Sequence, residues 1–137
     1  MKIEVVEKPS VELISFFEQR IAEFNIARWE VKEKIPVAIR VTNEADEIVA
    51  GVSAKTFGHW LLIDNLWVAD SLRGQSMGSK ILKQLETAAI HRGCKFVLLD
   101  TLGFQARPFY EKYGYTVQWT QQNYPKEGQK YFMVKEL

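Results

Sequence analysis

A chain of 137 residues with 47% apolar and 12% aromatic residues has the size and composition of one globular domain, which excludes a disordered protein and predicts a single domain over residues 1–137. Its net charge of +1 gives no broad attraction to nucleic acid or to a membrane surface, so neither is expected as a partner. One cysteine excludes an intrachain disulfide and a cysteine-based metal cage, and the start of the chain does not read as a signal peptide, so we expect a cytoplasmic protein without a metal.

The first half of the chain predicts one helix among four strands. Ile3–Val6 is a short apolar run expected to form the first strand. A helix follows, with Ser10 as its N-cap and an apolar face that extends to about Ile26. Alternating apolar residues then predict three further strands: Ile35–Thr42, Ile48–Phe57 and His59–Val68.

The second half predicts two helices and three strands. A small-residue turn opens a helix that ends at Gly93. The later elements are expected as a buried strand, a short helix and two last strands, at Phe96–Leu99, Arg107–Tyr113, Tyr115–Thr120 and Tyr131–Val134. The central strand–helix–strand unit requires a right-handed crossover between parallel strands. The order therefore predicts a mixed α/β fold, with a mixed sheet and helices on both of its faces.

The turn from Arg73 to Ser79 is the first candidate for chemistry. It lies between a strand and a helix, where unpaired backbone N–H groups and the helix dipole favour a phosphate. Its glycines, Gly74 and Gly78, fit neither the P-loop spacing nor the dinucleotide pattern. A pyrophosphate site and an ordinary turn with Ser76 as N-cap are both open at this point.

Two motifs carry a resemblance to a known family. Val68, followed after four residues by Arg73-Gly74-Gln75-Ser76-Met77-Gly78-Ser79, resembles the acetyl-CoA loop Q/R-x-x-G-x-G/A of the GNAT superfamily of N-acetyltransferases. Ser76 takes the place of the middle glycine and restricts the backbone if that position needs a positive φ. Ala106 to Tyr115 resembles the family's late helix, A-x-x-F-Y-x-x-x-G-F, although Gly103 replaces the asparagine that often precedes it.

The resemblance implies a mostly antiparallel sheet with one splayed parallel pair, formed by the fourth and fifth strands. It implies acetyl-CoA as cosubstrate, without a metal, and direct acetyl transfer to a primary amine in a ternary complex. The loop N–H groups would hold the pyrophosphate, and the backbone of Leu66 and Val68 would meet the pantetheine arm or the thioester carbonyl. The implied cofactor-binding residues are Leu66, Trp67, Val68, Arg73, Gly74, Gln75, Ser76, Met77, Gly78, Ser79, Ala106, Phe109 and Tyr110.

Two residues are candidates for catalysis. In the family, the tyrosine that matches Tyr110 lies near the sulfur of CoA, so Tyr110 is expected to supply a proton or a hydrogen bond to the leaving thiolate. Asp64 is the candidate base for the attacking amine, although it reads equally well as a solvated or paired carboxylate. His59 and Asp100 are weaker alternatives, as a turn residue and as a helix-capping residue.

Other residues are expected near the acceptor or in the core. Trp60 and Tyr124 lie next to loops and are candidates for lining the acceptor pocket, whereas Cys94 is expected to be an inert packing residue. The resemblance implies a small-molecule or peptide amine as the acceptor, and the last strands are expected as a homodimer contact. A non-catalytic acyl-CoA-binding domain and a generic nucleotide-binding domain remain the alternatives.

Overall fold

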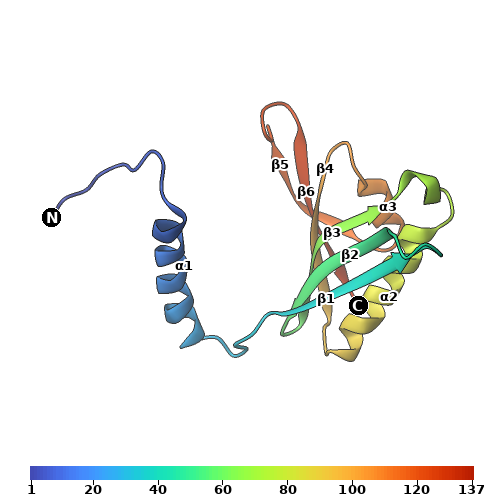
Figure 1. Ribbon diagram of the computed structural model, residues 1–137, viewed down its shortest axis with the longest axis horizontal. Coiled ribbons are helices and arrows are strands. Elements are labelled where there is room, and N and C mark those ends of the chain that lie inside the picture. The colour runs from blue at the N-terminus through green and yellow to red at the C-terminus, as the bar shows by residue number, and fades with distance from the viewer. The chain divides into compact units, whose positions relative to one another are not determined.

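The computed structural model describes all residues from Met1 to Leu137. The chain consists of two compact units, Met1–Lys32 and Glu33–Leu137. The larger unit contains the whole sheet (Figure 1). The expectation of one domain over residues 1–137 stays a prediction.

The smaller unit contains one helix, α1 (Val11–Ile26). Its N-cap is confirmed, because the Ser10 hydroxyl oxygen accepts a hydrogen bond of 3.1 Å from the backbone N–H of Leu13. The expected strand at Ile3–Val6 is wrong, since residues 1–10 contain no strand. A strand forms only as part of a hydrogen-bonded ladder, and this unit offers no second strand to pair with.

The larger unit is a six-stranded open sheet in the order β1-β2-β3-β4-β6-β5. All neighbouring strands are antiparallel except β3 and β4, which are parallel. This arrangement confirms the predicted mixed and mostly antiparallel sheet. The strands are β1 (Ile35–Thr42), β2 (Ile48–Phe57), β3 (Trp60–Val68), β4 (Phe96–Leu102), β5 (Thr116–Gln122) and β6 (Gln129–Glu136).

Two α-helices and a short 3₁₀ helix connect the strands of this unit: α2 (Met77–His91), α3 (Arg107–Lys112) and η1 (Asp70–Leu72). The buried residues of α2 recur at helical spacing, as Ile81, Leu82, Leu85 and Ala89. They share one apolar core with Tyr110 of α3 and with alternate residues of the strands. Because α1 belongs to the other unit, the expectation of helices on both faces of the sheet stays a prediction.

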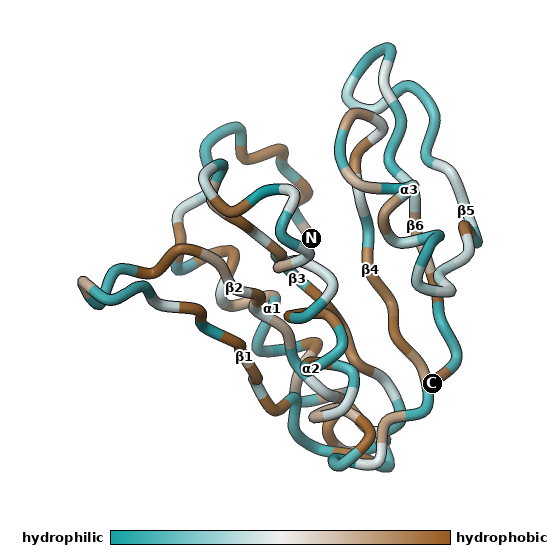
Figure 2. The backbone as a smooth tube through the Cα atoms, turned by 90° about the vertical axis from the view of Figure 1, so that its right-hand side faces the viewer, coloured by the Kyte–Doolittle hydropathy of each residue, from teal (hydrophilic) through white to brown (hydrophobic).

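The parallel strands β3 and β4 form a fork. Their register joins Trp60–Leu62 to Phe96–Leu98, and no further residues of the two strands are paired. Figure 2 shows the two strands close together at one end and diverging toward the other. Both strands run toward the open end, where the turn 73–79 and helix α3 begin. Ligands of open α/β sheets commonly bind at such a point, beyond the carboxyl ends of parallel strands.

Candidate active site

A cavity of about 600 Å³ occupies the open end of the fork. Residues of β3 form one wall, and β4 with the segment before α3 forms the other. Its lining residues are Ile63, Asp64, Asn65, Leu66, Trp67, Val68, Arg73, Leu99, Asp100, Thr101, Phe104, Gln105, Ala106 and Tyr110. The cavity therefore brings Tyr110 and Asp64, which are 46 positions apart in the sequence, to one site.

The backbone of β3 turns unpaired groups toward this cavity. Val68 of β3 and Ala50 of β2 face each other. The N–H of Ala69, the residue after Val68, donates to the carbonyl of Val49, the residue before Ala50, at 2.9 Å. In an antiparallel ladder this pattern marks Val68 as a non-hydrogen-bonded position, whose own N–H and C=O point away from β2. Leu66 lies two residues earlier and has the same orientation. Both backbones therefore face the fork, where β4 no longer pairs with them.

The turn before α2 presents three N–H groups. The first intrahelical bond of α2 runs from Lys80 N–H to the Ser76 carbonyl at 3.1 Å, so the N–H groups of residues 77–79 precede the helical ladder. Gly74 reaches φ +83° in open space, so its backbone conformation is what requires glycine there. Arg73 is paired with Asp70 at 3.3 Å, but both side chains are mostly exposed. Such a pair contributes little and leaves the guanidinium available to an anion.

Ser76 itself has a left-handed backbone, with φ 58°. Ser76 is the N-cap residue of α2, as one of the two open alternatives had it, but its side chain makes no capping hydrogen bond. Instead, the Ser76 carbonyl accepts a hydrogen bond of 2.9 Å from the Ser79 hydroxyl. The position needs a positive φ, the case in which serine restricts the backbone more than glycine does.

A second cavity, of about 530 Å³, lies between this turn and α3. The two elements approach closely, because a Cβ on Gly78 would lie 3.3 Å from the ring of Phe109. Every implied cofactor-binding residue lines one of the two cavities except Gln75, which lines neither. The residues that line both are Leu66, Val68, Arg73 and Ala106.

Tyr110 is 6% exposed, and its ring packs edge-on against Phe109 and Tyr115. Burial, with a smaller contribution from the charge of Asp100, raises the pKa of Tyr110 to about 12. The phenol is thus a neutral hydrogen-bond donor throughout the physiological pH range.

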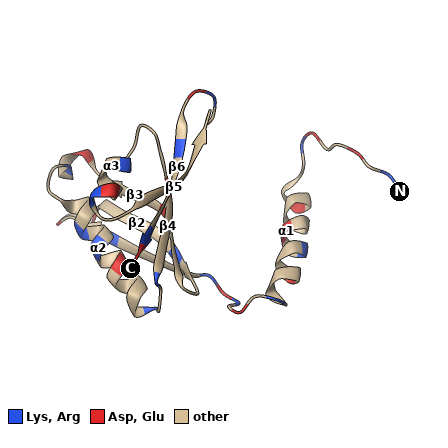
Figure 3. Ribbon diagram, turned by 180° about the vertical axis from the view of Figure 1, so that it is seen from behind, with Lys and Arg blue, Asp and Glu red and all other residues tan.

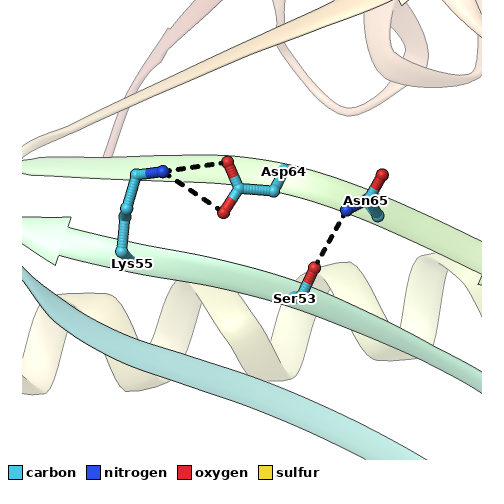
Figure 4. Close-up of polar contacts among 4 residues, drawn as sticks. All are labelled: Ser53, Lys55, Asp64 and Asn65. Carbon is cyan, nitrogen blue, oxygen red and sulfur yellow. Dashed lines mark hydrogen bonds and ion pairs between the residues drawn. The ribbon is translucent and has the colours of Figure 1, made fainter. Parts of the chain in front are cut away.

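Asp64 lies on the exposed part of β3 and is paired with Lys55 of β2. The two side chains meet at 3.2 Å, with 43% and 36% of their surfaces exposed (Figure 4). On the same pair of strands, the Asn65 side-chain amide donates to the Ser53 hydroxyl at 3.3 Å. Asp64 is therefore paired, as one of the two alternatives had it, and it also lines the cavity; its role as the base stays a prediction. His59 lies at the closed end of the fork, where its carbonyl accepts the N–H groups of Lys95 and Phe96.

The two aromatic candidates for the acceptor pocket do not line this cavity, and their role at the acceptor stays a prediction. Trp60 stacks on Phe96, with ring centroids 5.0 Å apart, and Tyr124 lies under the ammonium of Lys130. Trp67 and Phe104 are the aromatic side chains that line the cavity together with Tyr110.

Two further positions are explained by their neighbours. A Cβ on Gly103 would lie 2.9 Å from the side-chain oxygen of Gln129, so an asparagine there requires that side chain to move. Cys94 is buried in the core, as expected of a packing residue, and burial raises the pKa of its thiol. No helix is both long and apolar enough to cross a membrane. No group of three or more His, Cys, Asp or Glu side chains is placed to hold a metal ion.

Comparison with known proteins decides the family. The model of the acetyltransferase (GNAT) family matches residues 4–115. The chain belongs to the GNAT acetyltransferase family. It is 31% identical over 116 residues to blasticidin-S acetyltransferase of Streptomyces morookaense, which covers 82% of this chain and 85% of the relative. It is 31% identical over 96 residues to acetyltransferase Atu2258 of Agrobacterium fabrum, covering 70% of each. A crystal structure of an acetyltransferase from Bacillus cereus aligns with TM-score 0.88 and 29% identity over 98% of both chains.

In this GNAT acetyltransferase, two further residues line the cavities: Lys112, which the sequence did not single out, and Asp100, which was expected as a helix-capping residue. Lys112 lines the second cavity. It lies two residues after Tyr110, and its place in the late-helix motif was the sequence signal that could have identified it. Asp100 lines the first cavity from β4. Its role was not readable from sequence, because only the fork places the end of β4 opposite Asp64.

Proposed function

We propose that this protein is an N-acetyltransferase that moves the acetyl group of acetyl-CoA directly to a primary amine in a ternary complex. One observation carries the proposal. The fork between β3 and β4 opens the backbone of Leu66 and Val68 onto a cavity that also contains Tyr110 and that shares Arg73 with the cavity at the turn 73–79. The small-molecule acceptor of the Streptomyces relative, blasticidin-S, favours a small molecule over a peptide as the acceptor.

The phosphates of acetyl-CoA fit the second cavity. Three N–H groups at the start of α2, the guanidinium of Arg73 and the ammonium of Lys112 border it. Backbone N–H groups at a helix start and two cations are the donors that a pyrophosphate requires. The residues present therefore match this part of the cosubstrate.

The thioester fits the fork. Acetyl-CoA supplies an activated acetyl group whose carbonyl oxygen gains negative charge when an amine attacks it. An N–H of Leu66 or Val68 is preorganised to stabilise that charge, because β4 has diverged and no strand competes for it. The attack forms the new C–N bond, the C–S bond breaks, and CoA leaves as the thiolate.

Tyr110 is the group placed to stabilise the thiolate. With a pKa of about 12, full proton transfer to a thiolate whose thiol has a pKa of about 8.5 is uphill by on the order of 5 kcal/mol. A hydrogen bond needs no such transfer and is strong when the acceptor is charged. We therefore assign Tyr110 as a hydrogen-bond donor that stabilises the thiolate. Of the two roles expected for it, a proton donor and a hydrogen-bond donor, the proposal keeps the second.

Asp64 is the proposed base for the amine. It lines the same cavity, and its carboxylate has only one partner, the half-exposed Lys55. An incoming ammonium competes with Lys55 for the carboxylate at little cost, because an exposed pair of this kind contributes about 1 kcal/mol or less. Asp64, directly or through water, takes the proton whose loss converts the ammonium into the attacking amine. The second proton of the nitrogen, lost as the amide forms, passes to water.

A non-catalytic acyl-CoA-binding domain is the second candidate. It is favoured by Ser76, which holds φ 58° where glycine would be unstrained, and by Gly103, which is closed off by Gln129. Both features weaken or remove cofactor contacts, but neither affects Tyr110 or Asp64.

Calorimetric titration with CoA and with ATP tests the ligand. We expect CoA to bind at one site per chain, and Arg73→Gln to weaken that binding. As a control, Arg92→Gln should leave it unchanged, because Arg92 donates to Ile35 and Pro36 carbonyls away from both cavities. Tight binding of ATP without binding of CoA would overturn the proposal in favour of a generic nucleotide-binding domain.

A further inference from the structure

Four charged residues form a row across the middle of the sheet, one on each of four neighbouring strands. In the spatial order β2, β3, β4, β6 they are Lys55, Asp64, Asp100 and Lys130. The two carboxylates flank the fork, and each is paired outward with a lysine, at 3.2 Å for Lys55 and 3.9 Å for Lys130. In Figure 3 most of the strand ribbon is tan, so Lys, Arg, Asp and Glu are few among the strand residues.

Strand register places all four residues on one face. Lys55 faces Leu62 across β2 and β3, and Leu62 faces Leu98 across the parallel pair. Asp64 and Asp100 each follow two residues later on their strands, and paired or alternate residues share a face. Asp100 in turn faces Phe132, two residues after Lys130.

This face is turned away from the core. Leu99 and Thr101, the neighbours of Asp100, are buried on the opposite side with α2. Two other charged residues on the face, Arg40 of β1 and Glu136 of β6, do not line the cavity. Asp64 and Asp100 do, so the amine that reaches the fork meets two carboxylates, while Arg73 lines the cavity only where it adjoins the second cavity at the turn.

The two lysines are held differently. Lys130 also lies over the rings of Tyr124 and Phe132, at 4.6 and 5.7 Å from their centroids, and these contacts add to its ion pair. Lys55 is paired with Asp64 and has no aromatic contact of this kind. When an ammonium takes its place at Asp64, Lys55 is left as a cation without a counter-ion next to the bound acceptor.

We propose that the acceptor is a zwitterion, a primary amine that also carries a carboxylate. Its ammonium lies between Asp64 and Asp100, and its carboxylate binds the released ammonium of Lys55. Such a ligand keeps the row neutral, whereas a simple amine adds one uncompensated positive charge. This inference rests on the proposed acetyltransferase function and names the acceptor class of that same site.

The test is thiol release from acetyl-CoA with matched pairs of acceptors, an amino acid against its amide and a second amine against its carboxylated analogue. We expect kcat/KM for the carboxylated member to exceed that of its neutral partner by about tenfold, mainly through KM, as one charge-assisted hydrogen bond allows. Lys55→Gln should abolish this preference by lowering the rate with the carboxylated member relative to the rate with its neutral partner. Lys95→Gln, at an exposed position away from both cavities, should keep it.

Equal or better use of the neutral amines, or an equal loss for both members in Lys55→Gln, would overturn the zwitterion inference and leave the acetyltransferase function intact. Absence of thiol release with every amine, despite binding of CoA, would overturn both. The two failures are therefore distinguishable in one data set.

Discussion

The rings of Tyr110 and Tyr115 lie edge to face, with centroids 5.5 Å apart, but their hydroxyl groups have different environments. The Tyr115 hydroxyl donates to the partly buried carboxylate of Glu86 at 2.6 Å. Tyr110 instead lines the cavity at the fork. Of these two adjacent tyrosines, Tyr115 therefore has a structural role, and Tyr110 has the role proposed in catalysis.

Tyr110→Phe should lower kcat for acetyl transfer by about 10- to 100-fold, the effect of losing one hydrogen bond to a charged group. Binding of CoA, measured by calorimetry, should change little. Tyr124→Phe is the matched control, because it removes a phenol hydroxyl away from the cavity. An unchanged kcat in Tyr110→Phe would show that the phenol does not stabilise the thiolate.

The raised pKa of Tyr110 also predicts a pH dependence of stability. The folded chain keeps this proton up to a pKa of about 12, whereas the unfolded chain loses it near pH 10. The native state therefore binds more protons over this interval, and its stability falls as the pH rises through it. Between pH 8 and about pH 11, the free energy of unfolding of the parent protein, measured with urea, should fall by about 1.4 kcal/mol more than that of Tyr110→Phe. An equal fall in the free energy of unfolding of the two proteins would contradict the raised pKa of Tyr110.

Asp64→Asn should lower kcat by about a hundredfold or more and remove the rise of the rate with pH that reports the base. The substitution keeps the shape of the side chain and disturbs only an exposed ion pair with Lys55, so the folded state should be retained. Kinetics over a range of pH check this expectation. A profile that keeps its rise in Asp64→Asn would assign the base to another group.

Ser76→Gly should tighten CoA binding or leave it unchanged, and should not destabilise the protein. The left-handed backbone costs serine about 1–2 kcal/mol, while glycine gains unfolded-state entropy of a similar size, and no side-chain cap is lost. Ser76→Val places a β-branched residue at the same φ and should weaken both stability and CoA affinity. A large loss of affinity in Ser76→Gly would show that the serine side chain contacts the cosubstrate.

The Glu86 carboxylate joins two elements of the core, because it accepts hydrogen bonds from Tyr115 and, at 2.9 Å, from Lys135. Glu86→Ala leaves the buried phenol and the ammonium without this partner and should lower the free energy of unfolding by about 2–3 kcal/mol. Glu111→Ala, which breaks the exposed Arg107–Glu111 pair, should cost about 0.5 kcal/mol or less. Similar losses in the two variants would contradict a structural role for Glu86.

Much of the fold was predictable, because local patterns determine it. The alternation in Ile35–Thr42 and Ile48–Phe57 predicted β1 and β2 with their observed bounds. The run Ile3–Val6 has a similar local pattern but lacks a partner strand in its unit, and pairing is not encoded locally. Trp60 was proposed for the acceptor pocket because it lies next to a loop. The register of β3 and β4 instead pairs it with Phe96, on which its ring stacks, and this register is not encoded locally.

The candidate site was predictable where a contiguous motif carries it. The turn 73–79 and the late helix with Tyr110 are of this kind, and the structure brings both to the adjoining cavities. Asp100 and the counter-ion Lys55 were not readable, because their positions beside Asp64 depend on strand order and register across the fork.

The most direct test of acetyl transfer is to incubate the protein with acetyl-CoA and a panel of primary amines, and to measure free thiol and acetylated amine in the same samples. The account predicts enzyme-dependent thiol release that matches the acetylated amine one to one, with no thiol released when the amine is omitted. Binding of CoA without thiol release for any amine would contradict it and assign the protein as a non-catalytic acyl-CoA-binding domain.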